Sequence, residues 1–179
     1  MVTDHVRLQK IRTVALVLAV LSLLVVLVSA YIRLEGAGLG CTDWPACYGQ
    51  LLASEPRAPQ YGFVRLVHRI TATVDLLLAC FLAWHCLRPQ PIQPAASYAT
   101  LLLLLMLTLS ALGIWSSDPR LPLVNFLNIM GGFGLLTFSW RVALAASPTP
   151  IREAASPPGL LLRLGVATLS VAVMLGAWI

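Results

Sequence analysis

Long apolar stretches dominate the chain and are separated by short polar segments. Five stretches, residues 13–32, 66–87, 97–115, 121–145 and 160–179, are each about 20 residues long, the length that crosses ~30 Å of hydrocarbon as a helix. Strands of a membrane barrel would alternate polar and apolar residues, whereas residues 101–105 are all leucine. Every backbone group of a lipid-exposed segment must be bonded within the segment, which favours helices. The pattern therefore predicts an all-α integral membrane protein, a bundle of five transmembrane helices.

The segments between these stretches have the composition of loops. Prolines follow the second stretch and fill the segment before the fifth, and Ser116-Ser117-Asp118-Pro119 forms a turn after the third. So short a turn predicts that the third and fourth helices are antiparallel neighbours. The first stretch resembles a signal peptide in position, but its length favours a retained membrane anchor.

Composition agrees with this interpretation and excludes other classes of protein. Hydrophobic residues make up 59% of the 179 residues and charged residues only 11%, against about 25% charged in soluble domains. An ordinary soluble enzyme and a disordered chain are thereby excluded. The net charge of +5 comes from single, scattered Lys and Arg, so no nucleic-acid partner is expected.

The basic residues also predict an orientation. Three of them lie just before the first apolar stretch, and Lys and Arg are enriched on the cytoplasmic side of membrane proteins. We expect the N-terminus in the cytoplasm, the lipid bilayer as the first partner, and residues 33–65 as a long loop on the opposite side.

That loop contains two cysteines in an unusual setting. Cys41 and Cys47 flank Pro45, and on the oxidising side of the membrane such a pair can persist as a disulfide bond. Three interpretations remain open: a structural disulfide, a redox-active pair strained by its short loop, and a metal site. Two Cys without a nearby His make an incomplete tetrahedral set.

The sequence around these cysteines resembles that of a known family. Residues 31–49 read Tyr-Ile-Arg-Leu-Glu-Gly-Ala-Gly-Leu-Gly-Cys-Thr-Asp-Trp-Pro-Ala-Cys-Tyr-Gly, which is similar to the first-loop signature of bacterial haem A synthases. His68-Arg69 resembles the haem-binding His-Arg pair of that family. Asn128 with the glycine-rich residues 131–134 resembles its fourth helix, and residues 175–178 resemble the start of its second half.

The resemblance implies a fold, a reaction and cofactors. Such proteins have eight spans in two four-helix halves, each half with a pair of haem-ligating histidines. They oxidise the C8 methyl of haem O to the formyl of haem A, for terminal oxidases of the bacterial cytoplasmic membrane, with a b-type haem as a second cofactor. Residues 1–145 would be the first four-helix half, with a periplasmic loop 33–65. Residues 146–179 would be a cytoplasmic, proline-rich linker and a fifth transmembrane helix.

The chain departs from the family pattern at two positions of the implied site. Arg65 stands where the family has a Glu, three residues before the ligand His, and Asn128 stands in place of the partner His. His68 remains the expected iron ligand and Arg69 the expected partner of a haem propionate, whereas Met106 or Met130 is a candidate substitute for the second ligand. The catalytic residues are therefore not assigned.

Two functions follow from these observations. The first is haem A synthesis by this chain or by a homo-oligomer that restores eight or more helices. The second is a non-catalytic paralogue that acts as an accessory or assembly subunit of a terminal oxidase. A haem-carrying electron-transfer subunit is a third possibility, but it needs a second axial ligand.

Polar residues within the apolar stretches have simpler interpretations beside these. His68 suits either a haem ligand or an interfacial imidazole. Asp75 lies on nearly the same helix face as His68, about 10 Å deeper. It is either a proton relay or a group that polarises the haem pocket, or else a protonated carboxyl bonded to a Thr or Ser of a neighbouring helix, such as Thr108 or Ser110. The glycines near Asn128 either pack helices closely or make room for a macrocycle. Cys80 and Cys86, six residues apart, are expected on different faces in the core.

Overall fold

The described part of the chain is helical. The computed structural model describes residues 2–34, 59–115, 122–147 and 159–178, which form the helices α1 (Val2–Leu34), α3 (Pro59–Leu87), α4 (Ala95–Trp115), α5 (Pro122–Ala145) and α6 (Leu160–Trp178). No strand occurs within these ranges. The predicted all-α fold is confirmed, and each predicted apolar stretch corresponds to one helix.

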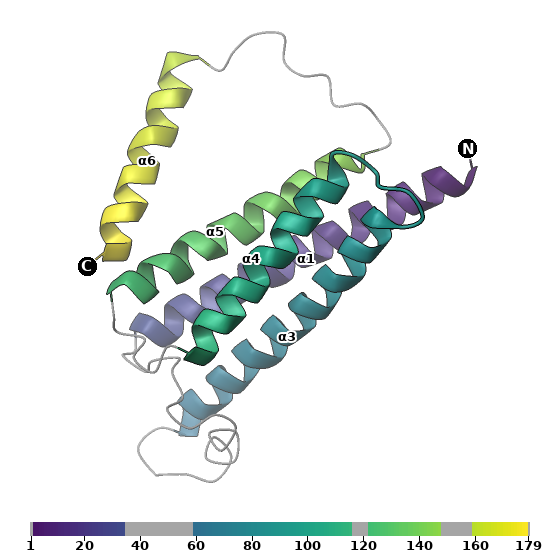
Figure 1. The fold of residues 1–179 in the computed structure, drawn as a ribbon. Helices are drawn as coiled ribbons and strands as arrows, with labels where there is room; N and C mark the ends of the chain where they lie inside the picture. The colour runs from purple at the N-terminus through teal and green to yellow at the C-terminus, as the bar shows by residue number, and fades with distance from the viewer. Residues whose placement is uncertain (1, 35–58, 116–121, 148–158, 179) are drawn as a thin grey trace.

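The helices α1, α3, α4 and α5 form an antiparallel bundle (Figure 1). In it α1 packs against α3 and α5, and α4 packs against the same two helices. The helices α3 and α5 are not in contact, so they lie diagonally opposite each other. The antiparallel pairing of α4 and α5 was predicted from the turn between them. The helix α6 packs against α5 alone among the described helices.

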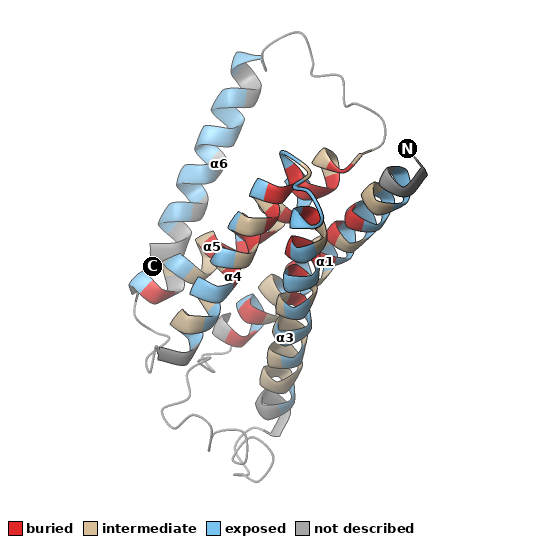
Figure 2. Cartoon of the chain, turned by 45° about the vertical axis from the view of Figure 1, so that its right-hand side comes forward, coloured by how far each residue is buried: buried red, intermediate tan, exposed pale blue. Residues whose placement is uncertain are grey.

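Four helices are long and apolar enough to cross a membrane: His5–Ile32, Phe63–Leu87, Ala95–Gly113 and Phe126–Ala145. The described apolar stretch of α6 is shorter, Arg163–Ala172. The chain is accordingly an integral membrane protein. Figure 2 shows exposed residues on the outer surface of the bundle and along α6; many of them are large and apolar, and lipid would cover such a surface.

Two helices are much longer than their apolar stretches. Eleven residues precede Thr13 in α1, and seven precede Leu66 in α3. Hydropathy marks only the part of a helix that lies in hydrocarbon, so the polar extensions were not predicted. Proline stands at the first position of both α3 and α5, where its missing N–H costs no hydrogen bond.

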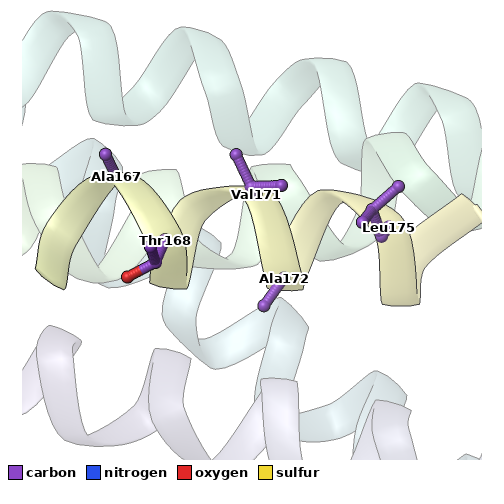
Figure 3. A pocket seen from close by; sticks show the side chains of 5 residues that line it. All are labelled: Ala167, Thr168, Val171, Ala172 and Leu175. Atoms are coloured by element: carbon purple, nitrogen blue, oxygen red, sulfur yellow. The ribbon is translucent and has the colours of Figure 1, made fainter. Parts of the chain in front are cut away.

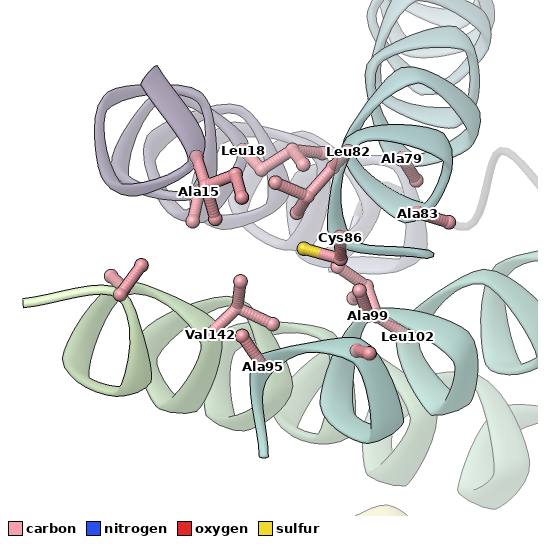
Figure 4. Close-up of a cluster of buried hydrophobic side chains, with 14 of the residues drawn as sticks. Ala15, Leu18, Ala79, Leu82, Ala83, Cys86, Ala95, Ala99, Leu102 and Val142 are labelled. Atoms are coloured by element: carbon pink, nitrogen blue, oxygen red, sulfur yellow. The ribbon is translucent and has the colours of Figure 1, made fainter. Parts of the chain in front are cut away.

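The tightest packing lies at the end of the bundle that carries the N-terminus and the connection between α3 and α4. On α1 the buried residues Ile11, Ala15 and Leu18 follow a spacing of three and four, which is one face of a helix. They meet a set rich in alanine from the other three helices, of which Figure 4 labels Ala79, Leu82, Ala83, Cys86, Ala95, Ala99, Leu102 and Val142. Ala96, Ala143 and Ala146, the residue after α5, belong to the same cluster. Small side chains let helices in a membrane approach closely.

Arg7 fastens α1 to the end of α3. Its guanidinium donates hydrogen bonds to the carbonyl oxygens of His85, at 2.7 and 3.0 Å, and of Gln90, at 2.9 Å. The last carbonyls of a helix lack partners within it, and a cation there also interacts favourably with the helix dipole. One side chain thus caps α3 and fixes the position of α1 beside it.

Candidate functional site

The inward face of α3 carries the polar residues singled out from the sequence. His68, Asp75, Ala79 and Cys86 follow one another at spacings of seven, four and seven residues, which places them on one side of the helix. Asp75, Ala79 and Cys86 are fully buried and His68 is half-buried. The prediction that His68 and Asp75 share a face is confirmed.

Asp75 is bonded to α1. It is 0% exposed, and its Oδ2 accepts a 2.7 Å hydrogen bond from Oγ of Ser22, which is also 0% exposed. A serine partner on a neighbouring helix was predicted, but the predicted residues were wrong. Thr108 is exposed and donates to the carbonyl of Leu104 in its own helix, and Ser110 is exposed. Both lie on the outer side of α4, which apolar periodicity alone could not reveal.

His68 lies between two arginines on the same part of α3. Arg65, His68 and Arg69 are all half-buried, and Nδ1 of His68 and one terminal nitrogen of Arg69 are shielded from solvent. A half-buried imidazole on an inward face has the chemistry of an axial haem ligand, and an arginine beside it has the charge and the donors to bind a propionate. These two residues fit a haem on one side of the iron.

Asn128 lies on α5, diagonally across the bundle from His68. A Cβ added to Gly132 would meet Val26 of α1 at 2.7 Å, and Ser22 is bonded to Asp75. Asn128 is four residues before Gly132, and His68 is seven before Asp75. Because α1 runs antiparallel to α3 and α5, counting back four residues from Gly132 corresponds to moving from Val26 to about residue 30 of α1. Counting back seven residues from Asp75 corresponds to moving from Ser22 to about residue 29. Asn128 and His68 therefore lie within about one helical turn of each other along the bundle axis.

The chemistry of Asn128 does not complete the site. Iron in haem proteins is bound by His, Cys, Met or Tyr, and an amide is not in that set. Met106 is buried in the core on α4. Leu105 of α4 lies against Gly134 of α5, which is six residues from Asn128. Met106 is therefore nearer to the level of Asp75 than to the level of Asn128 and His68. Met130 is half-buried on α5, but two residues from Asn128 it lies on another side of that helix. Of the predicted ligands, His68 alone has the placement expected of an axial ligand, and a second ligand from Met106 or Met130 stays a prediction.

The glycines of α5 serve helix packing. A Cβ at Gly131 would lie 2.5 Å from Leu109 of α4, and one at Gly132 would lie 2.7 Å from Val26 of α1. Neighbouring side chains already fill the space that these glycines leave. Of the two interpretations of this segment, the structure favours close helix contact over room for a macrocycle at these positions.

Packing is looser at the level of His68 than at the other end. Residues 64–69 of α3, 128–130 of α5 and 111–112 of α4 are half-buried, although Ser29 and Ile32 of α1 and Val124 of α5 are buried at this end. The larger set of buried residues lies at the alanine-rich end. The more loosely packed end holds Arg65, His68, Arg69 and Asn128. This end of the bundle therefore combines half-buried helix faces with the four polar residues that the family resemblance singled out.

The cysteine predictions have mixed outcomes. Cys41 and Cys47 lie outside the described residues, so their pairing stays a prediction. Cys80 is exposed and Cys86 is buried, which confirms that they lie on different faces but contradicts the placement of Cys80 in the core. Among the described residues, no group of three or more His, Cys, Asp or Glu could hold a metal ion.

A hollow of about 360 Å³ lies along α6, lined by Ala167, Thr168, Val171, Ala172 and Leu175 (Figure 3). Its lining is nearly all apolar, and the Thr168 hydroxyl donates to backbone carbonyls of its own helix. It offers no group that would bind iron or a propionate.

Two contributing residues were not identified from the sequence. Ser22 interrupts an apolar run and lies on the same face as Ala15 and Leu18, a position that marks an inward polar residue. Arg7 lies before the first apolar stretch, and nothing in the sequence indicates that it reaches across to α3.

Comparison with known proteins supports a relation over most of the chain. The sequence pattern of a family described as cytochrome oxidase assembly protein matches residues 12–179. A haem A synthase of Shewanella oneidensis is 31% identical over 179 residues, which cover 89% of this chain and 53% of that protein. A haem A synthase of Symbiobacterium thermophilum is 32% identical over 70% of this chain and 39% of its own length.

A further relative has a different name. A protoheme IX farnesyltransferase of Thermus thermophilus is 36% identical over 54% of this chain, but over only 17% of its own length. The chain spans about half the length, or less, of the curated haem A synthases it matches. No solved structure matches.

Proposed function

The chain belongs to the cytochrome oxidase assembly protein family, and from this membership we propose that it is a haem A synthase-like protein of a bacterial cytoplasmic membrane. The reaction proposed is oxidation of the C8 methyl of haem O to the formyl of haem A, for assembly of a terminal oxidase. The relatives that match 70% and 89% of this chain are named haem A synthase, which favours this function over that of an accessory subunit.

The position of His68 carries the proposal. Its imidazole is half-buried on the inward face of α3, at the loosely packed end of the bundle, and it stands beside Arg69. We propose that His68 binds haem iron and that Arg69 binds a propionate. Haem bound there would supply the redox chemistry, of b type or as the haem O substrate, while the protein supplies position and a largely dry environment.

Asp75 and Ser22 support this arrangement from about 10 Å deeper. Their hydrogen bond joins α3 to α1 and opposes rotation of α3 about its axis. A rotation that exposed Asp75 would also turn His68 toward lipid. We therefore assign Asp75 as a positioning residue for the face that carries His68.

In the proposed organisation the chain has two parts and associates with a second haem-binding unit. Residues 1–145 form the haem-binding half, with the N-terminus in the cytoplasm, and residues 146–179 form the linker and fifth helix. A second four-helix unit, supplied by another copy of this chain, would give the eight helices implied by the family. The Cys41–Cys47 disulfide belongs to the same proposal.

A pyridine haemochrome spectrum of the chain purified from cells supplied with haem tests the assignment. We expect bound haem in the wild-type chain and a loss of at least most of it in His68→Ala. The matched control is His85→Ala, since His85 lies on the same helix at the opposite end of the bundle and is also half-buried. This control should retain the wild-type amount of haem.

Two results would contradict the assignment. A wild-type chain that is folded but colourless would remove the haem site, and equal haem loss in both variants would remove the specific role of His68. The haemochrome band also reports the haem type, which distinguishes a b-type haem from haem A.

A further inference from the structure

We propose that the end of the bundle opposite His68 binds the headgroup of an anionic phospholipid, on the outer surface where α3 meets α1. The site is formed by Lys10 and Arg88, with Phe81, Trp84 and His85 between them. It shares no residue with the proposed haem site and does not depend on it.

These side chains form one continuous surface. Phe81, Trp84 and His85 follow spacings of three and four residues, so they lie on one face of the last two turns of α3. Arg88 directly follows the last residue of α3, and its backbone N–H donates to the carbonyl of Trp84 at 2.9 Å. Phe81 and His85 are in edge-to-face contact, with ring centroids 4.2 Å apart. Trp84 is 63% exposed and lies at the end of the membrane-spanning segment, where tryptophans meet the lipid headgroups.

The cations of this surface lie over its aromatic rings. Nζ of Lys10 is 5.0 Å from the centre of the Phe81 ring, and the Arg88 guanidinium is 5.7 Å from that of Trp84. Such cation–π contacts hold each long side chain in place but leave its charge unneutralised. Lys10 and Arg88 are both exposed, so their charges remain available to a phosphate.

Charge complementarity identifies the occupant. Among the side chains that the structure describes, only Asp75 is acidic, and it is buried within the bundle. Arg7, bound to the carbonyls of His85 and Gln90, adds a further positive charge beside the surface. Basic clusters at the membrane boundary attract anionic lipid, worth about 1 kcal/mol for each Lys or Arg.

The adjoining part of α3 suits an acyl chain. Val74, Leu77 and Phe81 continue the same stripe toward the middle of the membrane, and all three are exposed. A phospholipid with its phosphate between Lys10 and Arg88 would lay its chain along these residues. A free phosphate ion would use the cations but not this apolar stripe, so we commit to the lipid.

Quenching of Trp84 by brominated lipid tests the proposal. The purified chain is placed in phosphatidylcholine vesicles that contain a small fraction of brominated phosphatidylglycerol or brominated phosphatidylcholine, and the Trp84 signal is the difference between each protein and its Trp84→Phe counterpart. We expect the anionic lipid to quench Trp84 at a roughly twentyfold lower fraction than the zwitterionic lipid. Lys10→Gln and Arg88→Gln should each reduce this preference about fivefold.

Arg12→Gln is the matched control. Arg12 is exposed near the same end of α1, but two residues from Lys10 it points to another side of the helix. It should keep the wild-type preference if the lipid binds at the proposed surface. The proposal is overturned if the wild-type chain shows no preference, if Lys10→Gln and Arg88→Gln retain it, or if Arg12→Gln loses as much as they do. Far-UV circular dichroism of each variant confirms that the helices are intact.

Discussion

Asp75 and Ser22 show how a single polar contact orders helices in a membrane. A carboxyl at this depth costs about 2.5–3.5 kcal/mol on insertion scales, so its helix has a strong preference for the rotation that turns it inward. The hydroxyl of Ser22 satisfies one oxygen at 2.7 Å, while Oδ1 has no hydrogen bond within the described part of the chain. The contact therefore specifies the α1–α3 interface more than it adds net stability.

Replacing Ser22 by alanine tests this role. Ser22→Ala leaves the buried Asp75 carboxyl without the hydrogen bond that the structure shows, so we expect the free energy of unfolding to fall by about 1–2 kcal/mol. Equilibrium unfolding of the chain in mixed micelles, followed by circular dichroism, measures the change.

Ser139→Ala is the matched control for that substitution. Ser139 is also 0% exposed, but its Oγ makes no hydrogen bond among the described residues. Removing a buried hydroxyl of this kind should leave stability unchanged or slightly raised. Equal losses in the two variants would show that the Ser22–Asp75 bond has no special weight.

At the scale of single residues, the sequence predicted types better than partners. Intramembrane cost alone identified Asp75 as inward-facing and in need of a hydroxyl partner. The choice of Ser22 over Thr108 or Ser110 depends on which helices are neighbours and how they are rotated. A helix in lipid carries apolar residues on nearly all its faces. The periodicity of apolar and polar residues, which in a soluble protein shows which face of a helix is buried, is therefore weak.

At the scale of elements, α5 is the helix most constrained by its small residues. It contacts both α1 and α4, and its glycines allow both approaches. The obstacle differs between the two sides. A Cβ at Gly131 would meet Cδ1, Cδ2 and Cγ of Leu109, a side chain with two rotatable bonds, whereas a Cβ at Gly132 would meet Cγ2 of Val26, a β-branched side chain with few alternative rotamers.

Gly132→Ala is accordingly expected to be the costlier substitution. The added Cβ would lie 2.7 Å from Val26, which forces α1 and α5 apart and should lower the free energy of unfolding by about 1–3 kcal/mol. Gly131→Ala should cost less, since Leu109 can change rotamer. Gly113→Ala serves as the control because nothing lies within 4 Å of its added Cβ. Equilibrium unfolding in mixed micelles measures all three variants. A loss of stability in Gly113→Ala as large as that in Gly132→Ala would refute the argument.

The sequence predicted each helix but not its full length or its neighbours. Apolar runs locate the hydrocarbon-spanning part, and proline marks the starts of α3 and α5. The extension of α1 to Val2 carries Arg7 to the end of α3, a contact between residues about 80 positions apart. Local patterns contain no information about such a contact.

At the scale of the whole molecule, the bundle has two dissimilar ends. One is closed by alanine-rich packing and by Arg7, and its outer surface carries cations over aromatic rings. The other is more loosely packed and contains Arg65, His68, Arg69 and Asn128. The family resemblance identified His68 and Asn128 as corresponding positions, but only the arrangement of helices shows that they lie at one level on diagonally opposite helices.

That arrangement predicts that Asn128→His will create a second axial ligand. An imidazole on α5 would face the haem-binding side of α3 at the level of His68, so iron held by His68 should acquire a second nitrogen ligand. We expect the absorption and electron paramagnetic resonance spectra to change to those of a low-spin, bis-histidine haem, and the haem to be retained more tightly. Thr137→His is the matched control because Thr137 is exposed on the same helix and should leave the spectra unchanged. A haem-loaded Asn128→His variant with the wild-type spectrum would mean that the two side chains do not flank a common site, and the diagonal placement would then have no role in binding.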